Sequence, residues 1–89
     1  MSRPHANESV FRALADPTRR RIVELLRKGE RPVGELAHAI GARQPAMSHH
    51  LGILRSAGII YQHRRGSHRV YQLEPASIMA AKRWFQRMT

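Results

Sequence analysis

Apolar residues recur at the spacing of an amphipathic helix in five segments of this chain. The first segment follows an N-cap residue at Asn7, and the second opens with Asp16-Pro17, an N-cap followed by proline at the first helical position. Glycines close the second, third and fourth segments. These signals predict helices at about residues 8–14, 17–28, 32–40, 44–57 and 75–88.

The fourth helical segment has two different faces. Met47, Leu51 and Leu54 fall at positions i, i+4 and i+7, which places them on one buried face. The opposite stripe is polar or small throughout, and consists of Gln44, Ser48, Gly52 and Arg55. A helix divided in this way presents hydrogen-bonding groups outward along its whole length.

Two short segments after the fourth helix have the pattern of a β-hairpin. We expect strands at Ile59–Arg64 and His68–Leu73, joined across Gly66-Ser67. In that register Ile60 faces Leu73, Gln62 faces Tyr71 and Arg64 faces Arg69. Like charges opposite each other destabilise a hairpin. The cluster of Arg64, Arg65 and Arg69 therefore favours an external partner, such as a phosphate backbone, that supplies negative charge.

The order of these elements predicts a mainly α fold with a small β-hairpin wing, a winged helix-turn-helix of order α-α-α-α-β-β-α. In such a unit one helix can enter a major groove while the hairpin reaches the neighbouring backbone. We expect one domain over residues 1–89, divided into a flexible tail (1–6), the helix-turn-helix (32–57), the wing (59–73) and a C-terminal dimerisation helix (75–88).

Charge narrows the class of partner. The formal net charge is +10, from sixteen Lys and Arg against six Asp and Glu. Residues 36–89 carry eight of the bases and a single acid, Glu74. Such a field attracts polyanions, among which nucleic acid is the usual one. Charge alone leaves DNA, RNA and acidic membranes open. No apolar run approaches the roughly 20 residues of a membrane span, so we expect a cytoplasmic protein without a membrane partner.

The same composition argues against an enzyme or a metal protein. The chain has no Cys, which excludes disulfides and thiolate metal sites. It has no glycine-rich phosphate loop, no paired carboxylates and no nucleophile with a base, so we expect neither catalysis nor a cofactor. Its six His include no pair at i and i+4. A histidine-ligated metal sensor therefore remains only an alternative.

Three separated motifs resemble the ArsR/SmtB family of bacterial repressors. They are Phe11 to Leu26 (FRALADPTRRRIVELL), Ser48 to Ile60 (SHHL with Leu54 and AGII) and Arg65 to Leu73. The resemblance covers roughly residues 9–74. It implies a homodimer that binds a palindromic operator, often in its own promoter. The Cys-Val-Cys element of the family's metal sensors corresponds to Ala37, His38 and Ala39 here. The chain is therefore more similar to the metal-independent members, with no metal residue expected.

Pattern and resemblance together predict a surface for double-stranded DNA. Gln44 and Ser48 have the groups to read base edges, and the wing arginines suit phosphates. The family match implies that His50 is partly packed near the backbone and that His49 is a groove contact. The predicted DNA-binding residues are Arg43, Gln44, Ser48, His49, His50, Arg55, Arg64, Arg65 and Arg69.

The two terminal helices leave more apolar surface than their own packing uses. Surplus apolar faces on terminal helices suggest a subunit interface, most simply that of a two-fold homodimer. The predicted interface residues are Val10, Phe11, Ile78, Ala81, Trp84, Phe85 and Met88. The function expected from all these features is a sequence-specific transcriptional repressor. A non-specific nucleic-acid-binding protein and a protein–protein module with degenerate DNA binding are further alternatives, and the effector, if one exists, stays open.

Overall fold

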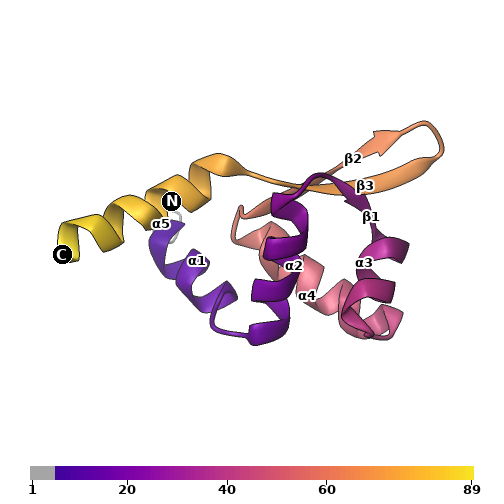
Figure 1. The fold of residues 1–89 in the computed structure, drawn as a ribbon, viewed down its shortest axis with the longest axis horizontal. Coiled ribbons are helices and arrows are strands. Elements are labelled where there is room, and N and C mark those ends of the chain that lie inside the picture. Colours follow the sequence, from indigo (N-terminus) through magenta and orange to yellow (C-terminus); the bar gives the residue numbers. More distant parts are fainter. Residues whose placement is uncertain (1–5) are drawn as a thin grey trace.

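Residues 6–89 are described by a computed structural model, and they form a mainly helical winged helix-turn-helix (Figure 1), which confirms the predicted fold class. The elements in chain order are α1 (Ala6–Ala13), α2 (Pro17–Arg27), β1 (Arg31–Pro32), α3 (Val33–Ile40), α4 (Gln44–Ser56), β2 (Ile60–Arg65), β3 (His68–Leu73) and α5 (Pro75–Met88).

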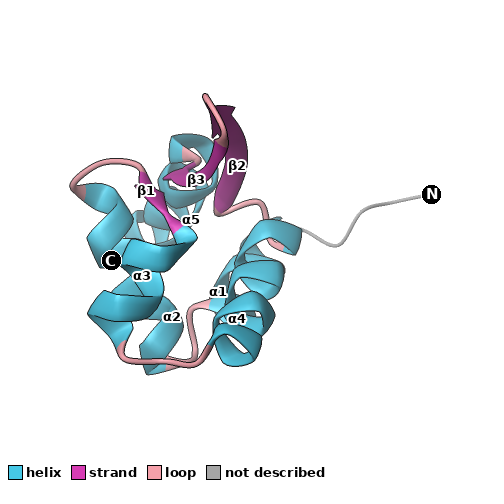
Figure 2. Ribbon diagram, turned by 90° about the vertical axis from the view of Figure 1, so that its right-hand side faces the viewer, coloured by secondary structure: helices cyan, strands magenta, loops and turns pink. Residues whose placement is uncertain are grey.

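The hairpin and α5 leave the helical body in opposite directions. The β2–β3 wing extends to one end of the longest axis, which spans 40 Å, and α5 extends to the other end (Figure 1). Turning the molecule shows the small sheet above the helices, with α1 and α4 side by side (Figure 2). The wing and the C-terminal helix are thus separate projections from one helical core.

The core lies where α2, α3 and α4 meet beneath the sheet. Its fully buried side chains come from every helix of that group and from the start of the hairpin. They include Ile22, Leu36, Met47, Leu51, Leu54 and Ile59. Met47, Leu51 and Leu54 are the three residues that the helical period of α4 placed on its buried face. Burying that face leaves the polar stripe of α4 on the outside.

Local signals set the helix boundaries. The Asp16 side chain accepts a hydrogen bond from the backbone N–H of Arg19 at 3.1 Å, and Pro17 is the first residue of α2. That N–H is the main reason why the pKa of Asp16 lies below its ordinary value. Gly41, at φ 77°, ends α3 in the left-handed conformation. Arg43 precedes α4 without a side-chain cap.

The predicted hairpin register is confirmed. Ile60 pairs with Leu73, Gln62 with Tyr71 and Arg64 with Arg69, and the turn lies at Gly66-Ser67, with Gly66 at φ 61°. The first strand is shifted by one residue, to Ile60–Arg65, while Ile59 is buried in the core. Arg64 and Arg69 therefore lie opposite each other on the wing.

Four expectations about the elements were wrong. The order contains an additional strand, β1, which pairs antiparallel with β3 and completes a three-stranded sheet in the order β1-β3-β2. Pro32 belongs to this edge strand, and α3 starts one residue later. Asn7 does not precede α1, because α1 already begins at Ala6. Ala6 is consequently not part of a tail, and residues 1–5 of that predicted tail lie outside the described residues.

Candidate nucleic-acid interface

The polar face of α4 is exposed. Gln44, Ser48, His49 and Arg55 all reach solvent, together with Arg43 immediately before the helix. The opposite face is between 0 and 2% exposed. Each exposed side chain offers hydrogen-bond donors, and Gln44, Ser48 and His49 can also accept, which is the chemistry that reads base edges. The structure thus presents these five predicted DNA contacts on the outside of one helix and its N-cap.

His50 occupies a different environment. Its side chain is only 17% exposed, and Nδ1 lies 3.3 Å from Nη1 of Arg19 and 4.0 Å from Oδ2 of Asp16. The Nε of Arg19 also donates to the carbonyl oxygen of Ala13 at 2.6 Å. The expected partial packing of His50 is confirmed, because its ring fastens α4 to the start of α2. A contact between His50 and DNA stays a prediction.

Arg55 joins the outer face of α4 to the hairpin. With the Gln62 amide turned so that its oxygen faces Arg55, that oxygen accepts from both terminal guanidinium nitrogens at 3.2 Å. Gln62 lies in β2, so this contact fixes the hairpin relative to the helix. Arg55 was predicted to contact DNA, and Gln62 was assigned no role beyond its strand pairing.

The three wing arginines differ in their surroundings. Arg64 and Arg69 are exposed and face each other across the hairpin. Within residues 6–89 neither of them forms an ion pair. Two exposed guanidinium groups on opposed strand positions can each donate hydrogen bonds to phosphate oxygens. The predicted role of Arg64 and Arg69 therefore has a fitting geometry.

Arg65 forms an ion pair with Glu30, which lies between α2 and β1. Its Nε and its Nη2 both donate to Glu30, the latter to Oε1 at 3.0 Å, and Nε2 of His63 lies 3.3 Å from the same Oε1. The hydrogen bond from Arg65 lowers the pKa of Glu30, and Glu30 in turn raises the pKa of Arg65. The expectation that an external partner supplies the negative charge for the whole cluster was wrong for Arg65, because Glu30 supplies it.

The Glu30–Arg65 pair predicts a defined pH dependence of stability. The pKa of Glu30 lies below its ordinary value of 4.5 in the folded chain, so its stabilising effect is present above pH 4.5 and is lost as the pH falls through the folded pKa. We expect Glu30→Gln to lower the free energy of unfolding at pH 7 and to have progressively less effect toward pH 3. Urea unfolding across this range measures it. For Arg65→Gln too, the difference in free energy of unfolding from the parent chain should shrink toward pH 3. A difference that does not change with pH in either variant would contradict a stabilising Glu30–Arg65 ion pair.

The predicted dimer residues fall into two groups. Phe11 packs edge-on against Trp84 and Phe85, with ring centroids 5.1 and 5.3 Å apart, and Phe85 and Met88 remain 56% and 60% exposed. Ile78 lines a shallow hollow together with Phe85, so apolar side chains of α1 and α5 share one surface here. Val10 is fully buried in the protomer, so its assignment to a subunit interface was wrong, whereas Ala81 is 8% exposed and its place in the interface stays a prediction. Both lie in the protomer core, since α5 packs along α1.

Met79 was missed as a surface residue. Its side chain is 45% exposed. Met79 lies next to Ile78 on α5, and it was not among the predicted interface residues.

The described part of the chain contains neither a membrane-spanning helix nor a cluster of metal-ligating side chains. None of its helices is long and apolar enough to cross a membrane. No three or more His, Asp or Glu side chains in this part gather into a group that could hold a metal ion.

Comparison with known proteins gives consistent matches. The family model described as "Bacterial regulatory protein, arsR family" matches residues 16–62. The chain is 38% identical to the transcriptional repressor SdpR of Bacillus subtilis over 76 residues, which cover 85% of this chain and 84% of SdpR.

Solved structures are similar over nearly the whole chain. The ArsR family transcriptional regulator RHA00566 superposes with a TM-score of 0.86 at 31% identity, over 94% of this chain and 92% of that one. The homodimeric winged helix-turn-helix DNA-binding domain Mb0332 of Mycobacterium bovis superposes with a TM-score of 0.74 at 30% identity, over 93% of this chain and 74% of that one. None of these proteins is named as an enzyme.

Proposed function

The chain belongs to the ArsR family of bacterial regulatory proteins, whose members are DNA-binding transcriptional regulators, and on that premise we propose that it is a homodimeric repressor of a palindromic operator. Each protomer places α4 in a major groove and its wing on the adjacent backbone. The two recognition helices of the dimer then enter successive grooves about 34 Å apart. Occupation of the operator blocks access of RNA polymerase to the promoter.

One observation carries this proposal. The exposed polar face of α4 and the paired arginines at Arg64 and Arg69 belong to adjoining elements, and Arg55 with Gln62 connects them. A helix that reads bases needs a second, basic element that fixes its register on the duplex. The adjoining helix and wing supply both kinds of contact.

Two further observations support the repressor and the dimer. The Bacillus subtilis relative is named as a transcriptional repressor, and the Mycobacterium bovis domain is described as homodimeric. The exposed apolar surface around Phe85 and Met88 gives the dimer a place to form. We propose Phe11, Ile78, Trp84, Phe85 and Met88 as its centre, with Met79 added at the edge.

The proposal includes no metal signal. Ala37, His38 and Ala39 occupy the place of the thiolate ligands of the family's metal sensors, and the chain contains no Cys. Thiol-based redox sensing is excluded for the same reason. Regulation, where it occurs, therefore needs a different kind of ligand.

A competition gel-shift assay tests the proposal. We expect the chain to bind a fragment upstream of its own coding sequence at least about a thousandfold more tightly than an unrelated duplex of equal length. We expect Gln44→Ala to reduce this ratio by weakening the specific complex more than the non-specific one. Equal affinity for every duplex would contradict the repressor and would favour the non-specific nucleic-acid-binding alternative.

A further inference from the structure

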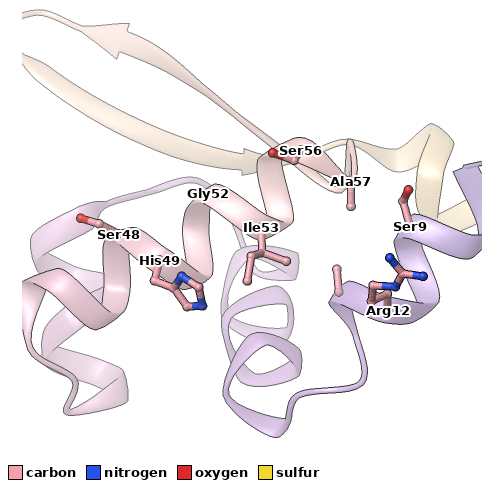
Figure 3. A pocket seen from close by; sticks show the side chains of 9 residues that line it. Ser9, Arg12, Ser48, His49, Gly52, Ile53, Ser56 and Ala57 are labelled. Carbon is pink, nitrogen blue, oxygen red and sulfur yellow. The ribbon is translucent and has the colours of Figure 1, made fainter. Parts of the chain in front are cut away.

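A hollow of about 490 Å³ lies between α1 and α4, on the side of α4 that adjoins its exposed polar face (Figure 3). Ser9, Arg12 and Ala13 border it from α1, and the opposite wall runs along α4 from Ser48 to the C-cap residue Ala57. Its described lining consists of Ser9, Arg12, Ala13, Ser48, His49, Gly52, Ile53, Ser56 and Ala57. A hollow of this size matches the volume of pockets that hold small organic ligands.

The polar groups around the hollow favour a negatively charged ligand. A guanidinium, an imidazole and three hydroxyls border it, and none of its described lining residues is acidic. A guanidinium carries five N–H donors in a fork that fits a carboxylate, so Arg12 can serve a ligand along with another contact. The floor between these groups is apolar, formed by Ala13, Ile53 and Ala57. The complementary molecule has an anionic group attached to a compact apolar body.

We propose that this hollow is a binding site for a small organic carboxylate. The carboxylate contacts Arg12, the apolar body lies against Ile53, and His49 borders the hollow on the other side of Ile53. Gly52 contributes no side chain to the lining, and a Cβ at this position would meet nothing within 4 Å. None of the DNA contacts predicted from sequence includes Ser9 or Arg12, so the site extends the functional surface of the chain to α1.

Occupation of the site acts on the proposed DNA-binding activity. Ser48 and His49 belong both to the hollow and to the predicted DNA surface of α4. A ligand there competes with the duplex for the same side chains and adds negative charge beside its phosphates. This consequence rests on the proposed function, whereas the binding site itself does not.

Titration of the DNA-free protein with benzoate tests the site directly. Benzoate and its neutral isostere benzamide are added separately to the ¹⁵N-labelled full chain, and amide shifts are followed by NMR. We expect benzoate to shift the amides of Ser48, His49 and Ile53 saturably, and to bind at least tenfold more tightly than benzamide. Absence of saturable benzoate binding at these amides, or equal binding of the two compounds, would overturn the proposal.

Two variants locate the ligand. Gly52→Leu adds a side chain among the lining residues at a position where a Cβ meets nothing within 4 Å, and it replaces glycine by a better helix former, so we expect the fold to be retained and benzoate binding to be lost. Arg12→Gln should weaken benzoate at least tenfold and leave benzamide unchanged. Lys28→Gln, which removes a positive charge at the far end of α2, is the control and should bind benzoate like the parent chain. Unchanged benzoate binding in both hollow variants would overturn the proposal.

A DNA-binding measurement in the presence of benzoate distinguishes failure of this inference from failure of the proposed function. Benzoate at a concentration that saturates the parent chain should weaken its binding to the operator fragment several-fold, and the same concentration should have a clearly smaller effect on Arg12→Gln. If the chain binds benzoate and fails to bind any DNA, the proposed function fails and the site stands. If benzoate binds in the hollow and DNA binding is unaffected, the competition step is wrong.

Discussion

Replacing both Arg64 and Arg69 by alanine should weaken DNA binding roughly ten- to hundredfold at moderate salt, for specific and unrelated duplexes alike. The two guanidinium groups face each other on the exposed wing and have no acidic partner within residues 6–89. Each phosphate contact contributes about 0.9 to the slope of log affinity against log salt. Two arginines in each protomer of the proposed dimer make four contacts, so the double variant should lose about 3.6 units of slope, which fluorescence anisotropy at several salt concentrations measures.

Arg65 provides the matched comparison. Glu30 already neutralises this arginine, so Arg65→Ala should change the salt slope by clearly less than one unit. Glu30→Gln should do the reverse and strengthen non-specific binding, because it releases the Arg65 guanidinium toward phosphates. If Arg65→Ala lowered the slope as much as Arg64→Ala does, the Glu30 contact would not persist in the complex, and all three arginines would be equivalent.

The strong periodic elements of the fold were predictable from local sequence. The face of α4 with Met47, Leu51 and Leu54 follows from helical spacing alone, and the two-residue turn at Gly66-Ser67 fixed the hairpin register. Strand β1 was not predictable, because two residues cannot display a period. Arg31 and Pro32 become a strand only through pairing with Tyr71 and Val70 of β3. That pairing is a tertiary effect.

The same distinction separates the site residues. The exposed stripe of α4 could be predicted because one helix positions all of its members. The partner of Arg65 could not, since Glu30 lies 35 positions earlier and only the folded chain brings it near. Val10 shows the converse error: an apolar residue on a terminal helix is compatible with an interface or a core. Because Val10 is completely buried within its own protomer, it belongs to the core.

Phe85→Asp should convert the proposed dimer into a monomer and thereby remove most of the operator affinity. Phe85 is 56% exposed and packs against Phe11, at the centre of the apolar surface on α1 and α5. A carboxylate there must be buried without a partner when two copies meet, which should weaken self-association about 100-fold or more. Sedimentation equilibrium measures the dissociation constant of the dimer for the variant and the parent chain.

Loss of the dimer should also appear in DNA binding. A monomer presents one recognition helix, so it loses the gain in effective concentration that connects the second half-site to the first. We expect operator affinity to fall by about two orders of magnitude, while affinity for a single half-site changes little. Ala76→Asp adds the same charge to the exposed start of α5, where a helix N-terminus accepts an acid, and should leave both measurements unchanged. If the Phe85→Asp protein stays dimeric, the subunit interface does not lie on α5. The two recognition helices would then be related by a two-fold axis in a different place.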